Sequence, residues 1–286
     1  MQPTTSLLGI FLFSILFTLN ACKPEATPEP DPDPAPVPVD VIDLSNWYLT
    51  LPVDADNDGR VDNIEQPALD NYRNIDRVKP YMYDGLDNSL VFNCPYTGIS
   101  TTNSSYSRTE LREQMVTNDN NVNWTMEDGG IMEGELKMDD ISSGHRTIIM
   151  QIHGRLTNEQ KNQIGASDND APPLLKIYWQ SNKVRVARKV MVNPNASDDD
   201  LLPKSAWEDD DAHWFDEEVN FNRFKLKVIA SEGRLEIQMN DESVVYEDIH
   251  MARWPFENYF KAGNYLQSTN DGAFAKLRFY TLTVTH

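Results

Sequence analysis

The chain has 286 residues and a formal net charge of −20, from 45 Asp and Glu against 25 Lys and Arg. An acidic chain repels phosphate backbones, so the composition excludes a typical nucleic-acid-binding protein. Residues 1–40 carry one Lys and five acids, a net of −4, so −16 of the −20 belongs to residues 41–286. A polyanionic ligand of any kind would therefore need a local cluster of cations.

The first element is an apolar run over residues 7–19, which has signal-peptide length and is too short to span a bilayer. It ends in Leu19-Asn20-Ala21-Cys22. This ending resembles the lipobox of bacterial lipoproteins, in which the signal is removed before an acylated cysteine. The resemblance implies a lipoprotein signal peptide over residues 1–22, lipidation of Cys22, and an exported protein in the cell envelope, at the outer membrane. The alternative is a plain secretory signal that ends in cysteine.

Residues 23–40 are dominated by Pro, Asp and Glu, a composition that favours extended polyproline II and cannot bury a core. We expect this linker to hold the following part away from a membrane, which the protein would touch only through its anchor. Residues 41–286 suit one large all-β domain. Cys94 is the one cysteine in that range, so no disulfide can form within it, and we expect Cys94 to be a small buried side chain.

Strand patterns dominate residues 41–286, and most alternate apolar and polar residues between Gly, Asn and Asp turns. About a dozen strands with few helical patterns predict an all-β fold, an antiparallel β-jelly roll or concanavalin-like sandwich with a concave groove. The predicted strands are 47–51, 89–93, 106–116, 131–138, 146–153, 174–180, 183–192, 224–230, 234–239, 243–246, 259–267 and 275–285.

Thr157 to Ile164 is the best helix candidate, because Thr157 and Gln160 have the spacing of a capping box. Two longer polar stretches, 154–173 and 193–220, interrupt the strand pattern. Loops of this length in a compact domain are usually functional or disordered. We interpret them as lids over a binding groove, with solvated insertions as the alternative.

An acidic segment follows the first predicted strand. Asp54, Asp56, Asp58, Asp62 and Glu65 occupy positions 1, 3, 5, 9 and 12 of an EF-hand calcium loop, with glycine at position 6. The flanking sequence reads as a strand and a proline rather than as two helices. The segment is therefore either a loop that binds a structural Ca²⁺ without the flanking helices or a polar loop that serves the fold.

Period-two alternation decides which side chains share a face of a strand. In the strand over 106–116, one face presents Tyr106, Arg108, Glu110, Arg112 and Gln114. Taken alone, such a face is typical of a half-exposed strand, and the Arg-x-Glu-x-Arg run could be a charge ladder.

Two later strands show the same polar alternation. Around Gln151, the predicted polar face holds Gln151 and His153, whereas Ile148, Met150 and Ile152 lie on the other. In the strand over 259–267, the polar side chains are Tyr259, Lys261, Tyr265 and Gln267, and the apolar ones are Phe260, Ala262 and Leu266. Together the three strands would form a surface suited to a chain of carboxylates and hydroxyls.

These segments match a known family. Ser-Arg-Thr-Glu-Leu-Arg at 107–112, Gln-Ile-His at 151–153 and Tyr-Phe-Lys-Ala-Gly-Asn-Tyr-Leu-Gln at 259–267 occur in this order. They closely resemble the three signature strands of the alginate lyases of polysaccharide lyase family 7. Residues 47–52 and 64–69 also resemble the family's opening segment, so the likeness covers 41–286. Asn264 departs from the family pattern, where Val, Ile or Ala is expected, but it points away from Tyr265.

The resemblance implies a β-jelly roll that binds alginate and cleaves it by β-elimination without a required cofactor. Arg108 and Gln151 would neutralise the uronate carboxylate, because the C5 proton is acidic only when the developing charge is stabilised. His153 would act as base and Tyr265 as acid on guluronate, whereas Tyr265 could serve as both on mannuronate. These four are the catalytic candidates.

Further residues are assigned to substrate binding. Arg112, Lys261, Gln267 and Tyr259 would contact neighbouring sugars, and Glu110 would hold the arginines in place. In this family Gln-Ile-His is associated with guluronate-containing blocks, so Ile152 predicts that preference, acting through packing. The resemblance leaves open whether cutting is endolytic or exolytic, and we expect a monomer.

Three other functions remain open at this stage. A lyase of another polyuronate is the nearest. A noncatalytic carbohydrate-binding jelly roll would need aromatic platforms and no acid/base pair. A glycoside hydrolase needs two carboxylates that flank the bond, for which Glu133 and Glu135 are the nearest candidates, although the pattern of laminarinase-like enzymes is missing.

Overall fold

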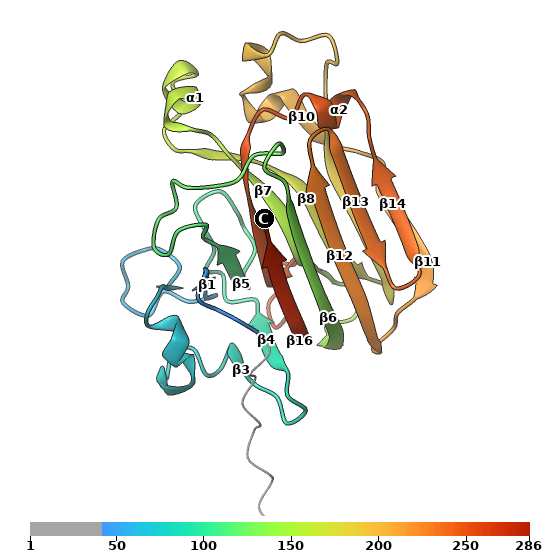
Figure 1. The fold of residues 1–286 in the computed structure, drawn as a ribbon. Helices are drawn as coiled ribbons and strands as arrows, with labels where there is room; N and C mark the ends of the chain where they lie inside the picture. Colours follow the sequence, from blue (N-terminus) through green and yellow to red (C-terminus); the bar gives the residue numbers. More distant parts are fainter. Residues whose placement is uncertain (1–41) are drawn as a thin grey trace, which may run out of the picture. The chain divides into compact units, whose positions relative to one another are not determined.

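The structure is a computed structural model that describes residues 42–286 (Figure 1). The expected signal peptide, the lipidated Cys22 and the linker 23–40 lie outside the described residues. Within the described part, no helix combines the length and the apolarity needed to cross a membrane.

Two antiparallel sheets make up the fold. The nine-stranded sheet has the order β10 (Trp207–Asp209), β9 (Lys183–Met191), β8 (Asp170–Gln180), β7 (Arg146–Arg155), β15 (Glu257–Leu266), β5 (Arg108–Glu113), β1 (Trp47–Thr50) and β2 (Asn63–Ile64), with β11 (His213–Glu218) also paired to β9. The seven-stranded sheet has the order β14 (Glu242–Tyr246), β13 (Arg234–Met239), β12 (Arg223–Ser231), β6 (Gly130–Ile141), β16 (Phe274–Thr285), β4 (Leu90–Pro95) and β3 (Met82–Asp84). This confirms the predicted all-β antiparallel fold of jelly-roll type.

Helices are few and short. They are α1 (Asn158–Gln163), α2 (Ile249–Ala252) and three 3₁₀ turns at Leu69–Asn74, Asp199–Leu201 and Lys204–Ala206. The predicted capping box is confirmed: the Gln160 backbone N–H donates to Thr157 Oγ1, and the Thr157 N–H donates to Gln160 Oε1. No residue of α1 is buried, so this turn is held by its capping box, by the partly buried Ile164 at its end and by a hydrogen bond from Gln160 Nε2 to the Pro255 carbonyl oxygen.

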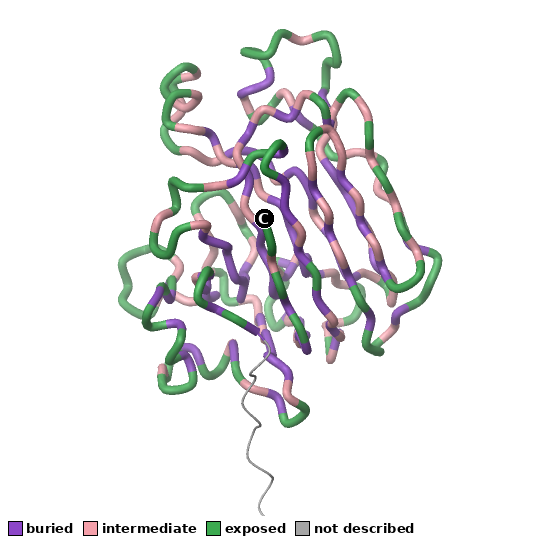
Figure 2. Tube along the Cα trace, in the orientation of Figure 1, coloured by how far each residue is buried: buried purple, intermediate pink, exposed green. Residues whose placement is uncertain are grey.

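The two sheets differ in burial, as Figure 2 shows along their strands. On the seven-stranded sheet, β12 and β13 alternate buried and more exposed residues, so one face packs on the core and the other meets solvent. In β5, by contrast, all six residues are buried. The outer face of β5 is polar, so its burial cannot come from the core alone, and a half-exposed strand is the wrong interpretation of it.

All the predicted strands are present, with ends shifted by a few residues. The prediction of a strandless loop over 193–220 is wrong, since β10 and β11 lie there and pair with β9. Their apolar pattern is weak because acids surround it, and Phe215 is the one fully buried position of β11. Cys94 is buried and free, as predicted.

One predicted face is also wrong. Ile148 lies on the outer face of the nine-stranded sheet, where it packs with Tyr178 and Ala187, whereas Met150 and Ile152 lie in the core. The register of β7 against β8 shifts between Ile148 and Met150. An extra residue in one strand breaks period-two alternation, so residues on either side of it no longer follow a single pattern.

Candidate active site

A hollow of about 640 Å³ lies over the outer face of the nine-stranded sheet. Its walls come from β1, β5, β7, β8, β9 and β15, together with residues 101–103, Asp168 and Lys204 from connecting segments. The four catalytic candidates line it, namely Arg108, Gln151, His153 and Tyr265. Of the binding candidates, Arg112, Lys261, Tyr259 and Gln267 also line it, and Glu110 lies buried beside them.

Strand register explains this convergence. β15 lies between β5 and β7, and Lys261 stands opposite both Arg112 and Gln151. Tyr265 stands opposite Arg108, and Tyr259 stands opposite His153. Directly opposed residues of antiparallel strands point to the same face, so three segments far apart in sequence share one surface.

Glu110 is the centre of a buried network with Arg108, Gln151 and Lys261. Its carboxylate pairs with Lys261 Nζ, accepts a hydrogen bond from Gln151 Nε2 and lies 3.1 Å from Arg108 Nη1. Burial opposes the charge of Glu110, but Lys261 and Arg108 outweigh it and hold its pKa below the usual range. Two cations surround one anion, so the network keeps an excess positive charge next to the hollow.

Arg108 is oriented from two sides. Its guanidinium carbon lies 3.7 Å from the centre of the Tyr265 ring, and Glu110 accepts a hydrogen bond from its Nη1. Its buried Nε has no hydrogen-bond partner among the described residues. Buried donors are rarely left unpaired, so a bound anion or a water is the expected partner.

His153 is held as a neutral imidazole. Its Nδ1 lies 3.0 Å from the carbonyl oxygen of Gly154, which places the proton on Nδ1 and leaves Nε2 as an acceptor. The ring stacks on Tyr259, with centres 5.2 Å apart. Burial is the main cause that lowers the pKa of His153 to about 4, although Asp170, 3.9 Å from Nε2, acts in the opposite direction. At neutral pH the group is therefore able to accept a proton.

Tyr265 presents a hydroxyl in the same hollow. Its oxygen lies 2.7 Å from Ser104 Oγ, which also accepts a hydrogen bond from the Tyr106 backbone N–H. The segment 101–106 thus positions the tyrosine hydroxyl from outside the sheet. Ser104 was not a candidate from sequence, because it lies in a polar run without periodicity.

The binding candidates differ in how far their polar groups are already bonded within the protein. Arg112 donates to Asn120 and Asn123 and to the carbonyl oxygen of Glu113, and its guanidinium lies over the Tyr259 ring. It is thus largely committed to the protein. Burial lowers the pKa of Lys261 to about 8 against the opposing effect of Glu110.

Other charged groups of the hollow were missed from sequence. Asp170 accepts a hydrogen bond from Asn103 and pairs with Lys204, so three separate segments meet beside His153. Lys176 and Lys189 line the hollow and share Asp209. Alternation in β8 places Lys176 on the outer face, but only the register shows which strand it neighbours.

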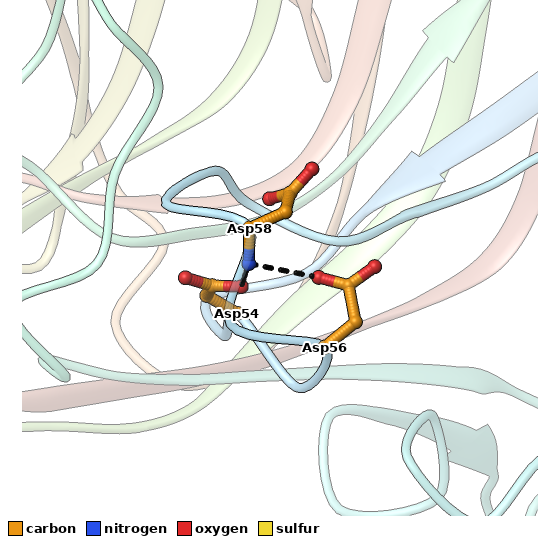
Figure 3. A group of neighbouring side chains, drawn as sticks. All are labelled: Asp54, Asp56 and Asp58. Carbon is orange, nitrogen blue, oxygen red and sulfur yellow. Dashed lines mark hydrogen bonds between the residues drawn. The ribbon is translucent and has the colours of Figure 1, made fainter.

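The acidic loop is assembled only in part. Asp54, Asp56 and Asp58 lie with carboxylate oxygens within 4.8 Å of one another (Figure 3). The backbone N–H of Asp58 donates to both Asp54 and Asp56. Asp62 instead accepts a hydrogen bond from the Ala55 N–H and faces Arg77, and neither Asp62 nor Glu65 joins the cluster. The predicted five-residue EF-hand set is therefore not brought together.

The carboxylates considered for a hydrolase lie elsewhere. Glu133 and Glu135 belong to β6 in the seven-stranded sheet, where they pair with Lys227 and Arg223. Neither lines the hollow. The carboxylate pair considered for a glycoside hydrolase is thus not at this hollow.

Comparison with known proteins identifies the family. The model of a family described as alginate lyase matches residues 42–286. An alginate lyase from Klebsiella pneumoniae is 31% identical over 169 residues, and the chain spans about half that protein, since the match covers 49% of each.

Solved structures are similar over most of the chain. The family 7 alginate lyase A1-II', in complex with product (GGG), has a TM-score of 0.70 and 27% identity, covering 88% of this chain and 100% of that one. An alginate lyase from Pseudomonas aeruginosa has a TM-score of 0.62 and 26% identity, covering 85% and 99%. Since the family model spans all the described residues, the chain belongs to the alginate lyase family.

Proposed function

We propose that the chain cleaves the 1,4-linkages of alginate by β-elimination in the hollow over the nine-stranded sheet. The observation that carries the proposal is the arrangement of a neutral imidazole, a tyrosine hydroxyl and a buried cationic network on one surface. A noncatalytic binding module would have no use for this acid/base pair.

Arg108 and Gln151 are proposed to bind the carboxylate of the sugar that loses its proton. The charge that develops on this carboxylate as C5–H breaks must be stabilised where it forms. Arg108 has an unpaired Nε, and one N–H of Gln151 is already held by Glu110, which fixes the direction of the amide. Such donors need no reorganisation at the moment of reaction.

His153 Nε2 is proposed to take the C5 proton, and the Tyr265 hydroxyl to give a proton to the leaving oxygen. The C–H electron pair becomes the C4–C5 double bond as the C4–O bond breaks, which leaves an unsaturated non-reducing end. The tautomer set by Gly154 supports this division, because Nε2 keeps its lone pair. The base must be neutral, and the low pKa of His153, about 4, meets this need.

A preference for guluronate-containing blocks is the finer part of the proposal. On guluronate the two protons lie on opposite ring faces, so separate base and acid groups are suited to it. Ile152 of the Gln-Ile-His motif is fully buried in the core, so it can act only through packing. Initial rates on polyguluronate and polymannuronate blocks would test this, and a faster rate on polymannuronate would contradict it.

The experiment for the function itself measures ultraviolet absorbance of the unsaturated product during incubation with alginate. We expect absorbance to rise with the wild-type protein. The Tyr265→Phe variant should lose at least about 10²-fold in kcat, because general acid catalysis is typically worth that much. No increase with alginate, together with an increase on another polyuronate, would overturn the substrate assignment.

We further propose that the protein is exported and anchored in the cell envelope through acylated Cys22, and that it acts as a monomer. Labelling with a radioactive fatty acid should mark the wild-type protein and not Cys22→Ala. Light scattering of residues 41–286 should give the mass of one chain.

A further inference from the structure

We propose that the nine-stranded sheet has a second binding area for the acidic sugar chain, beyond the reacting centre. It consists of Arg146, Tyr178, Arg185 and Trp214, named here the distal patch, and Tyr178 also lines the edge of the hollow. The inference rests on the proposed function, because the ligand is another stretch of the same polyuronate.

A continuous row of opposed residues joins the reacting centre to this patch. Tyr265 stands opposite Ile148, Ile148 opposite Tyr178, Tyr178 opposite Arg185, and Arg185 opposite Trp214. Directly opposed residues share a face, so the whole row lies on the face that carries the hollow. The row crosses from β15 through β7, β8 and β9 to β11, which Figure 1 labels at the far edge.

The length of the row suits a polymer rather than a single sugar. Neighbouring strands lie roughly 4.8 Å apart, so the four steps from Tyr265 to Trp214 cover about 19 Å. Ile148 is in this row only because the register of β7 shifts next to it. A chain that crosses the strands from the reacting centre would therefore pass over Tyr178 and reach the distal patch.

The side chains of the patch form an alternating set of cations and rings. The guanidinium carbons of Arg146 and Arg185 lie 5.3 and 5.1 Å from the centre of the Tyr178 ring, and Arg185 lies 5.9 Å from the Trp214 ring. Guanidinium groups bind carboxylates in a bidentate manner, and aromatic rings offer an apolar body to the flat side of a sugar. Trp214 is 40% exposed, unusually high for so large an apolar ring.

Charge pairing separates these arginines from most other cations of β8 and β9. Lys183 also lacks a carboxylate partner among the described residues, but its Nζ donates to the carbonyl oxygen of Asp216. Lys176 and Lys189 pair with Asp209, and Arg188 pairs with Asp210 and Asp248. Among the described residues, no carboxylate forms an ion pair with Arg146 or Arg185. These two arginines therefore flank one ring without a carboxylate partner, although the domain has a net charge of −16. An anionic ligand is their complement.

The kinetic test compares substrates of different length. Arg185→Ala and Trp214→Ala should each lower kcat/KM on long alginate by on the order of tenfold, the effect of losing one good contact. On the shortest cleavable oligouronates, which cannot reach Arg185 or Trp214, the loss should be much smaller. Equal losses on short and long substrates would overturn the proposal.

Lys225→Ala is the matched control. Lys225 lies on β12 of the opposite sheet, is exposed, and has no ion-pair partner among the described residues. Its removal changes the net charge by as much as Arg185→Ala does. This variant should keep wild-type kinetics on both substrates. Thermal unfolding of all three variants would verify that the fold is intact.

A binding test separates this inference from the proposed function. Electrophoresis through a gel that contains alginate needs no turnover and would be run in the Tyr265→Phe background. Adding Arg185→Ala or Trp214→Ala should reduce retardation, while Lys225→Ala should not. If the wild-type protein gave no unsaturated product, the proposed function would fail. The retardation assay would still show whether the distal patch binds alginate. Unchanged retardation would overturn the patch whatever the activity.

Discussion

Glu110 shows how one buried side chain can serve a reaction that it does not perform. Arg108, Lys261 and Gln151 all contact its carboxylate, and each is nearly fully buried. Buried charges persist only when they are paired and hydrogen-bonded. Glu110 thus allows two cations to remain below the hollow, where they can meet a uronate carboxylate.

Glu110→Gln should therefore destabilise the fold strongly. Breaking a buried pair leaves its partners uncompensated, which typically costs about 3–5 kcal/mol. Urea unfolding would measure the loss, and kcat/KM should also fall. The control is Glu133→Gln on β6, which removes a half-exposed partner of Lys227 and should cost within about 1 kcal/mol. A Glu110→Gln variant as stable as the control would contradict the role of the network.

The pH dependence of catalysis should follow two groups of the hollow. His153 acts as a base when neutral, and its pKa of about 4 predicts that the acid limb of kcat/KM lies near pH 4, below the ordinary histidine value of 6.5. The pH at which this limb lies depends on the burial of His153 and on the charged groups that face it, Asp170, Lys261 and Arg108. Lys261, with a pKa of about 8, should lose its charge above that pH and weaken substrate binding.

Stability should change in the same pH range. The folded state keeps His153 neutral down to about pH 4, whereas the unfolded chain binds a proton below about pH 6.5. Stability should therefore fall as pH decreases from 6.5 to 4, and His153→Phe should reduce this slope. An acid limb of kcat/KM near pH 6.5 would show that the imidazole is not buried as described.

At the scale of elements, the sequence identified the strands better than it identified their neighbours. Alternation predicted the polar faces of β5, β7 and β15, because each buries an apolar face on the core. It could not predict the shift beside Ile148, which depends on how β7 pairs with β8. Alternation also missed β11, because the apolar pattern of that strand is confined to Trp214 and Phe215 among acids.

The site was predictable to the extent that its residues lie on periodic strands. The motif residues on β5, β7 and β15 could be placed on one face, and the structure brings them together. Asp170, Asn103 and Lys204 could not be found, because they come from the start of β8, the segment before β5 and a 3₁₀ turn, and only the folded chain makes them neighbours. Contacts of that kind leave no periodic signal in sequence.

A substitution at Gly263 would test the close pairing of β15 with β5. Its φ of 137° lies in a region that side chains rarely adopt, and an added Cβ would lie 2.7 Å from Thr109 O and 2.9 Å from Glu110 Cα. Gly263→Ala should therefore cost about 3 kcal/mol or more in unfolding free energy. Gly144→Ala is the control, since its Cβ would meet nothing within 4 Å and only the backbone would be strained. Equal losses would show that β5 can move away.

Metal removal would test whether the acidic loop contributes to catalysis or only to stability. Asp54, Asp56 and Asp58 do not line the hollow, and the proposed reaction uses no metal. Adding a chelator should therefore leave kcat unchanged in the folded protein. If the loop binds Ca²⁺, the effect should be a lower melting temperature alone, because a ligand that binds only the folded state stabilises it. A fall in kcat without unfolding would contradict this separation of loop and site.

At the scale of the whole molecule, charge poses a conflict. The net charge of −16 on residues 41–286 repels an anionic polymer, whereas the cations of the hollow and the distal patch attract it. The two effects act over different distances. Repulsion by the overall field is screened beyond a Debye length of about 10 Å at 0.1 M salt, whereas contacts between partly buried groups are screened much less.

Activity on long alginate should therefore depend on salt in two phases. From roughly 0.01 M to 0.1 M salt, where the Debye length shrinks from about 30 to about 10 Å, kcat/KM should rise as long-range repulsion is screened. Near 1 M, where it is about 3 Å, kcat/KM should fall as the local contacts weaken. Short oligouronates carry fewer charges and should show a smaller initial rise. A steady fall from the lowest salt would mean that the local cations outweigh the acidic field at every distance.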